Sequence, residues 1–328
     1  MRRRENLVSP THQREGNRHD QDLLKDGERG RFFRGNLHCH SNRSDGLVEP
    51  TEVVAAYSEA GYDFLCLSDH FEQEHGWRIT DTRPFQDEDF ATILGAELST
   101  APWDERDCYW VTAAGLPPDF APPPPDDQAE AIRRAANLGA FVVMLHPGLN
   151  NLPLEAVDGL PGLDAVHAVE IYNHNCAMAA LPDRAYGAYM LDGLLEGSRR
   201  LLVNAGDDAH FGHPLDRFGG WVEVHCDRLD PDALLESLKA GRYYSTQGPQ
   251  LRELLVDGDR LRVGTSDVYA IALTGGGDRW QSGQERHGEP GAPITEAEFD
   301  VAPFRGSYCR ITVVDVAGRR AWGNPIWP

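Results

Sequence analysis

The sequence contains no Cys-x-x-Cys pair, and its six cysteines are spread along the whole chain. Paired thiolates hold closed structural zinc sites, and clustered cysteines are typical of the disulfide frameworks of small secreted domains. Their absence favours reduced thiols in a cytoplasmic protein. The thiols interpreted in this way are Cys39, Cys66, Cys108, Cys176, Cys226 and Cys309.

Basic residues are also scarce. The chain has 31 Lys and Arg against 52 Asp and Glu, which gives a net charge of -21. Such a surface repels a phosphodiester backbone, so nucleic acid is excluded as a bulk partner. A pocket that holds metal ions would still attract a small anion, because bound cations are often the largest local charges. Small anionic substrates therefore remain compatible with the sequence.

The N-terminal region has no long apolar run after Arg2-Arg3-Arg4. A secretory signal or a membrane span needs such a run, so neither is predicted, and no membrane partner is expected. Residues 1–34 are interpreted as a flexible leader.

From about Phe32 onward, short apolar segments alternate with helical patterns, which is typical of parallel strands with crossover helices. Pro50 suits a first helical turn and Gly61 the position after a last one, so they bracket a helix. The run Phe141–Leu145 ends on His146, and reactive residues follow other strands in the same way. Parallel barrels build their sites at this carboxyl face. Residues 35–248 are therefore predicted to form an α/β barrel with one polar mouth.

From Pro249 the pattern changes to short strands separated by Gly and Asp turns. This pattern is typical of antiparallel β structure. Residues 249–328 are predicted to form a small C-terminal antiparallel β domain, for which no role is assigned.

Histidines and carboxylates are concentrated where apolar runs stop. Successive strand side chains alternate faces, so His38 and His40 point to one side and can chelate one ion. By the same alternation Asp208, rather than Asp207, shares a face with His210. Imidazoles and carboxylates without thiolate suit reactive divalent ions such as Zn, Mn or Fe.

These residues occur in ordered motifs that resemble those of the polymerase and histidinol phosphatase (PHP) superfamily. The motifs, within residues 35–248, are His38-Cys39-His40-Ser41, Ser44-Asp45-Gly46, Ser68-Asp69-His70, Gly95-Ala96-Glu97, His146-Pro147 and Gly206-Asp207-Asp208-Ala209-His210. The resemblance implies a distorted seven-stranded (β/α) barrel with two or three divalent ions at its mouth.

The resemblance also assigns ligands. One ion would be held by His38, His40, Glu97 and Asp208. A second ion would be held by Asp45, His70 and His210. A third would lie between Glu97 and His146, but no histidine between these two residues completes that position, and Cys108 or Asp107 are the alternatives.

Further residues are candidates for catalysis and substrate binding. Glu97 and Asp208 would position the ions for catalysis, and His174 and His213 are candidate general acids, because an imidazole titrates near neutral pH. Arg43, Arg217 and Asn173 are candidate substrate contacts, since an arginine fork matches phosphate oxygens.

The predicted function is a divalent-metal-dependent hydrolase that attacks with metal-bound hydroxide, and the leading substrate is a small phosphorylated metabolite. The tail Asn324-Pro325-Ile326-Trp327 is similar to that of a PHP branch with carbamate and ester hydrolases. Hydrolysis of a carbamate, amide or carboxylic ester is therefore the first alternative. A non-catalytic metal-binding interaction protein is the second.

Overall fold

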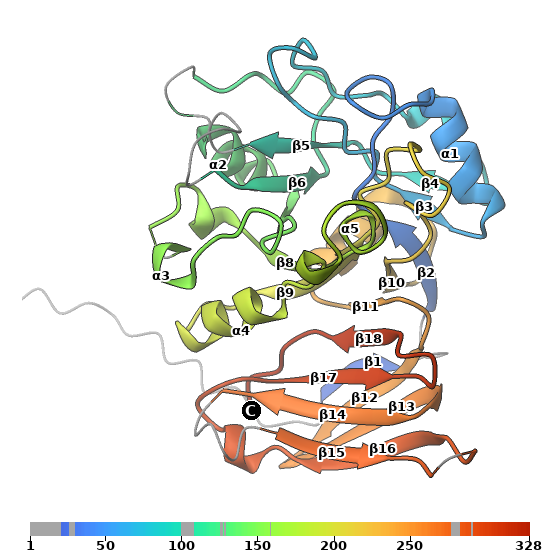
Figure 1. Cartoon of the computed structure of the whole chain (residues 1–328), viewed down its shortest axis with the longest axis vertical. Helices are drawn as coiled ribbons and strands as arrows, with labels where there is room; N and C mark the ends of the chain where they lie inside the picture. Colours follow the sequence, from blue (N-terminus) through green and yellow to red (C-terminus); the bar gives the residue numbers. More distant parts are fainter. Residues whose placement is uncertain are drawn as a thin grey trace, which may run out of the picture.

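The computed structural model describes residues 21–25, 30–99, 108–124, 127, 129–157, 159–276, 283–289 and 291–328. An α/β part lies above a β-rich C-terminal part in Figure 1. The helices are α1 Pro50–Glu59, α2 Ala129–Asn137, α3 Leu154–Val157, α4 Ala188–Glu196 and α5 Pro231–Lys239. The strands are β1 Gln21–Lys25, β2 Arg31–Asn36, β3 Phe64–Leu65, β4 Ala91–Thr92, β5 Gly95–Ser99, β6 Trp110–Ala114, β7 Phe141–Met144, β8 Ala168–Asn173, β9 Leu202–Gly206, β10 Trp221–Cys226, β11 Tyr243–Thr246, β12 Leu251–Asp257, β13 Arg260–Val268, β14 Ala270–Gly275, β15 Gly283–His287, β16 Ile294–Asp300, β17 Cys309–Val314 and β18 Arg320–Gly323.

The α/β part is built from two sets of strands. β2, β3 and β4 are neighbours in one sheet, and β5 to β9 form another in sequence order. Two isolated parallel bridges join the sets, one between Cys39 and Ala209 and one between His70 and Glu97. The first bridge places the segment that follows β2 beside the segment that follows β9, and the second places the segment that follows β3 beside β5. The arrangement is barrel-like, and all the predicted ligands lie near these junctions.

Local sequence explains these elements. α1 has Pro50 in its first turn and buries Val53, Val54 and Tyr57 on one face, as the 3.6-residue period requires. Gly61 follows the helix with φ of 80°, the left-handed region that glycine adopts without a steric penalty. The prediction that Pro50 and Gly61 bracket a helix is confirmed. β7 is buried throughout, as expected for a strand covered on both faces.

Strand direction differs in part from the prediction. β7, β8 and β9 are parallel, and so are β2, β3 and β4. β6, however, is antiparallel to both β5 and β7. Apolar runs bounded by loops reveal strands but not their direction, so periodicity alone could not detect this reversal. The mixed α/β class is correct, whereas a complete seven-stranded barrel remains a prediction.

The C-terminal part is a sandwich of two antiparallel layers. β1, β12, β13 and β16 form one layer, and β14, β15, β17 and β18 form the other. Leu254 and Leu261 of the first layer share an apolar core with Ile271 and Ile311 of the second. The second layer continues through β11 and β10 into β2, so one sheet crosses the predicted boundary at residue 249.

The predicted leader needs a correction. β1 pairs with β12, and β2 begins at Arg31, so parts of residues 1–34 are integral to the sheets. The β1 segment is short and is followed by charged residues, which hid its strand pattern, whereas the apolar run that starts at Phe32 was part of the predicted pattern. Residues 1–20 and 26–29 lie outside the described residues.

The six cysteines are buried free thiols. Within the described part of the chain, no helix has the length and apolar character required to cross a membrane.

Candidate metal centre

The first group of donors lies at the ends of β2 and β9 and in the middle of β5. His38 Nε2 is 3.1 Å from Glu97 Oε2 and 3.1 Å from Asp208 Oδ1. His40 Nε2 is 3.2 Å from each of the same two oxygens. The ligand atoms of all four residues lie within 4.8 Å of one another, and all four side chains are buried. We call this set of four residues the first donor group.

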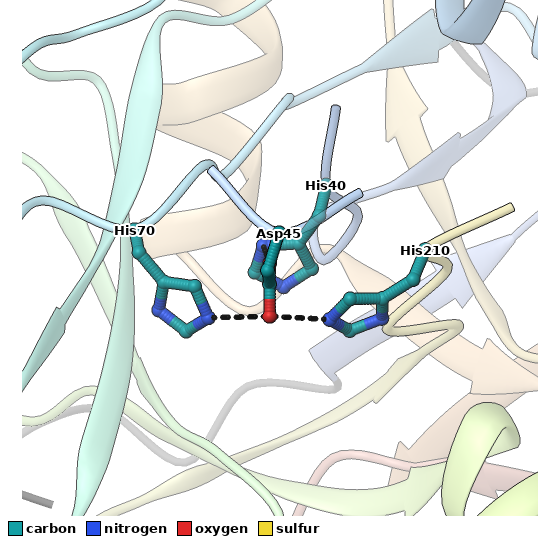
Figure 2. Close-up of side chains that lie close together, drawn as sticks. All are labelled: His40, Asp45, His70 and His210. Atoms are coloured by element: carbon teal, nitrogen blue, oxygen red, sulfur yellow. Dashed lines mark hydrogen bonds and ion pairs between the residues drawn. The ribbon is translucent and has the colours of Figure 1, made fainter. Parts of the chain in front are cut away.

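The second donor group consists of His40, Asp45, His70 and His210, whose ligand atoms also lie within 4.8 Å of one another. Figure 2 shows His70 and His210 approaching one carboxylate oxygen of Asp45 from opposite sides, with Nε2 to Oδ2 distances of 3.4 and 3.2 Å. His40 Nδ1 lies 3.5 Å from the other oxygen, Oδ1. His40 therefore belongs to both groups.

His146 lies at the edge of the first donor group. Its Nε2 is 3.5 Å from Glu97 Oε1, the oxygen that faces away from His38 and His40. Its ring also packs against Trp110. Cys108 is buried, and Asp107 lies outside the described residues. Among the described residues, no third set of donors gathers around His146. A third ion remains a prediction.

The electrostatics of the two groups are strongly coupled. Burial favours the neutral imidazole of His40, but the carboxylates of Asp208 and Glu97 outweigh burial and raise its pKa to about 10. Burial would likewise raise the pKa of Asp208, but His38 and His40 hold that pKa well below its usual range. The pKa of Asp45 is lowered too, because hydrogen bonds from His210 and His70 outweigh its burial. The carboxylates thus require nearby positive charge.

The donor atoms fit divalent ions. His40 Nε2 is buried and has no hydrogen-bond partner of suitable geometry, although two carboxylate oxygens lie 3.2 Å away. Buried polar atoms normally find partners, so an atom of this kind calls for an explanation. Two of the predicted ligands also have a left-handed backbone, with φ of 26° at His146 and 57° at Asp208. Such strain in non-glycine residues is concentrated at functional sites.

Glu170, which was not predicted as a site residue from the sequence, contacts the first donor group directly. It lies in β8, is 1% exposed, and its Oε1 is 2.9 Å from His38 Nδ1. Its Oε2 accepts hydrogen bonds from the His146 backbone and from Asn173 Nδ2. A carboxylate within the apolar run Ala168–Ile171 was the available signal, because a charge is rarely buried in a strand without a partner.

Two further aspartates organise the loops around the centre. Asp69 accepts hydrogen bonds from the Ser41 backbone and from the hydroxyls of Ser41, Ser44 and Thr80, at 2.6 to 2.9 Å. Asp207 points away from the donors, as predicted. It accepts from Tyr57 and from the backbone amides of residues 218–220.

The two candidate general acids lie outside the donor groups. The Nδ1 of His174 is 2.8 Å from the Tyr172 hydroxyl, and a Cβ built on Gly219 would meet its ring, so the ring lies against that loop. Burial lowers the pKa of His174. His213 is exposed, and its Nδ1 accepts from the Leu215 backbone. Their catalytic roles remain predictions.

The candidate substrate contacts have different environments. Arg43 is half exposed and pairs with Glu49. Arg217 lies over the rings of Phe211 and Phe218, and its Nη1 bonds to the His213 carbonyl and to Asp216.

Asn173 is buried. Besides Glu170, its Nδ2 contacts Asp208 Oδ2 at 3.2 Å. Asn173 therefore contacts the first donor group through Asp208. Substrate binding by Arg43, Arg217 and Asn173 remains a prediction.

No family model matches the chain, and no curated protein matches its sequence. Among solved structures, it is similar to a two-domain protein from Bacteroides vulgatus that contains a predicted PHP-like metal-dependent phosphoesterase, with 17% identity and a TM-score of 0.52 over 90% of this chain and 94% of that one. It is also similar to a protein from Bifidobacterium adolescentis assigned as a metal-dependent phosphoesterase, with 16% identity and a TM-score of 0.41 over 55% and 89% of the two chains. An amidohydrolase from Chromobacterium violaceum, with bound sulfate and no metal, has 15% identity and a TM-score of 0.37 over 54% and 87%.

The similarity to the Bacteroides protein spans both parts of this chain and shows the fold. The chain therefore shares the fold of this two-domain, PHP-like protein, as expected from the resemblance of its motifs.

Proposed function

We propose that this chain is a divalent-metal-dependent phosphoesterase that hydrolyses a small phosphorylated metabolite. The observation that carries the proposal is the pair of donor groups that share His40, each with its ligand atoms within 4.8 Å. The description of the Bacteroides protein as a PHP-like metal-dependent phosphoesterase is consistent with this reaction class. We propose two ions from the set Zn, Mn and Fe, with a third position beside His146.

The chain's own residues would fix two ion positions. One position would be held from buried elements by His38, His40, Glu97 and Asp208, and the other would be held from the mouth by Asp45, His70 and His210. When bound, divalent ions supply a nucleophile at neutral pH and stabilise the charge on the substrate and leaving oxygens. The positive charge of two divalent ions would exceed the negative charge of the donor carboxylates, which are those of Glu97, Asp208 and Asp45. The excess would create a site for an anion in an otherwise acidic chain.

Substrate positioning is assigned to the loop that carries His213 and Arg217. The guanidinium of Arg217 is held by Asp216 and by two aromatic rings, so its position is defined before a substrate arrives. A fixed guanidinium suits a phosphate group, because it donates two parallel hydrogen bonds. His213 and His174 would protonate the leaving group, and Arg43 and Asn173 would contact the substrate.

The test is release of inorganic phosphate by purified protein that has been stripped of metal and reloaded with Mn, Zn or Fe. A panel of sugar, nucleotide and amino-acid phosphates should contain at least one substrate whose turnover stops on chelation and returns on reloading. Asp208→Ala protein is the matched control and should be inactive under every loading. Silence across the panel at full metal occupancy would refute the proposal.

The same preparations separate the alternatives. Turnover of aryl carbamates or p-nitrophenyl carboxylic esters without phosphate release would favour acyl hydrolysis. Metal binding without turnover of any class would favour a metal-dependent interaction protein.

The remaining assignments are also proposals. We place the protein in the cytoplasm, with residues 35–248 as the hydrolase barrel of seven strands and residues 249–328 as the supporting β domain.

A further inference from the structure

Two buried carboxylates outside the donor groups contact different members of the groups. Glu170 accepts from His38, which belongs only to the first donor group. Asp69 accepts from Ser41 and Ser44, which lie in the loop that carries Asp45 of the second group. Glu170 is 1% exposed and Asp69 is 2% exposed, so protein groups rather than solvent supply the hydrogen bonds to both carboxylates.

The contact of Glu170 sets the tautomer of His38. His38 Nδ1 donates to Glu170 Oε1 at 2.9 Å, so Nε2, which faces Glu97 and Asp208, is the nitrogen left to bind an ion once the ion displaces its proton. A Cβ at Gly206 would lie 2.8 Å from Glu170 Oε1 and 2.9 Å from the His38 Cβ. A glycine at this position therefore leaves the space that the pair needs.

The contacts of Asp69 fix a loop rather than a ring. Its Oδ1 accepts from the Ser41 backbone at 2.7 Å and from the Ser44 hydroxyl at 2.9 Å. Its Oδ2 accepts from Thr80 Oγ1 at 2.6 Å. Asp45 follows Ser44 directly and His70 follows Asp69, so this carboxylate supports two ligands of the second donor group.

We propose that the two ion positions are stabilised independently, the first through Glu170 and the second through Asp69. The inference rests on the proposed metal-dependent function. Both residues are positioning residues, because they act through ligands and do not contact the ions. Loss of a partner of this kind lowers metal affinity by about 10- to 100-fold.

Glu170→Gln tests the first half, since the amide cannot satisfy all three contacts. If the Gln oxygen faces His38, its NH₂ meets the donors of His146 and Asn173. If the amide is flipped, its NH₂ forces the His38 proton onto Nε2 and removes the lone pair. Asp69→Ala tests the second half, because it removes at once every hydrogen bond that Asp69 itself makes to the 41–45 loop.

The experiment titrates metal-free protein with Mn²⁺ or Zn²⁺ and counts tight and weak ions by equilibrium dialysis with elemental analysis. Each single variant should keep one tight ion and bind the other about 10- to 100-fold more weakly. A His210→Ala background, which weakens the second position, identifies the affected ion. In that background Glu170→Gln should remove the remaining tight ion, whereas Asp69→Ala should have no further effect.

Asp192→Asn is the stability control. Asp192 lies on α4, away from the centre, and the substitution breaks its pair with Arg310 of β17. Both ions should remain tightly bound despite the lower stability. Circular dichroism checks the fold, and Glu170→Asp, which withdraws the carboxylate by one methylene, replaces Glu170→Gln if the latter does not fold. Equal weakening of both ions by either variant, or no weakening by both, would overturn the inference. A wild-type protein that binds no ion would instead refute the proposed function.

Discussion

At the residue scale, His40 is the residue on which both donor groups depend. Its Nε2 faces Glu97 and Asp208, and its Nδ1 faces Asp45. Within the described chain it is the member that the two groups have in common. Its loss should therefore affect the centre more than the loss of a ligand that serves one group.

His40→Ala is expected to lower the affinity for both ions by at least about 100-fold, which is the upper end of the effect of losing a residue that hydrogen-bonds to a ligand. His210→Ala should retain one tight ion. Elemental analysis after dialysis at a fixed free-metal concentration distinguishes the two results. The exposed His287, which pairs with Glu285 on β15, provides the control, because His287→Ala should keep both ions. A His40→Ala protein that retains one tight ion would contradict the shared role.

The same residue gives the metal-free protein a characteristic pH dependence. Asp208 and Glu97 raise the pKa of folded His40 to about 10 from 6.5. A raised folded pKa means that the folded state binds the proton more tightly than the unfolded chain does. This contribution to stability is complete below pH 6.5 and is lost as the pH rises toward 10.

Metal-free protein should therefore lose stability between pH 6.5 and 10, and metal-loaded protein should lose less, because the ion displaces the proton. Urea unfolding at several pH values measures the slope. His40→Gln separates this effect from other groups that titrate in the same range, and its slope should be shallower. Equal slopes for the metal-free wild type and the variant would argue against the assigned cause.

At the element scale, the C-terminal tail is fixed to the barrel-like part by Asn324. Its Oδ1 accepts from the Val203 backbone in β9, and its Nδ2 donates to the carbonyls of Gly241 and Tyr243 beside β11. One side chain thus connects the tail with two strands. The contact of Asn324 could not be predicted from the sequence, because a side-chain contact across 121 residues leaves no local pattern.

Asn324→Ala is expected to lower the free energy of unfolding by roughly 1 to 3 kcal/mol, because three backbone groups lose a partner. Both ions should stay bound, since the contacts lie outside the donor groups. Val316, which is 86% exposed, provides a neutral control in the Val316→Thr variant. Urea unfolding measures the free energy of unfolding of each variant. If Asn324→Ala lowers it by less than Val316→Thr does, solvent replaces these hydrogen bonds.

The positions of helices and strands could be predicted from the sequence better than the direction and pairing of the strands. Most of the donors could be placed because they follow apolar runs, and strand alternation put His38 and His40 on one side. Glu170 was missed because its neighbours read as an ordinary buried strand. The reversed direction of β6 and the pairing of β1 with β12 depend on tertiary contacts, which periodicity does not encode.

At the scale of the whole molecule, the two parts of the chain are joined by a sheet and by a charged clamp. The sheet runs from β18 through β11 and β10 to β2. The clamp is a bidentate pair in which Arg310 of β17 donates to Asp192 of α4 at 2.8 and 2.7 Å. Trp322 of β18 also stacks on Tyr172 of β8. The C-terminal sandwich therefore packs directly against the barrel-like part and is not connected to it by a linker alone.

Arg310→Met is expected to lower the free energy of unfolding of the whole chain by about 1 to 3 kcal/mol. Removing one partner of a fully buried pair costs roughly 3 to 5 kcal/mol, but here the carboxylate remains partly hydrated, because Asp192 is 29% exposed against 7% for Arg310. Asp192→Leu combined with Arg310→Met should recover part of the loss, since no unpaired charge is left. Because the shared sheet couples the two parts, each variant should unfold in one transition when followed by tryptophan fluorescence and circular dichroism. Two separate transitions in the wild type would contradict this coupling, and a double variant no more stable than Arg310→Met would contradict the role of the unpaired charge.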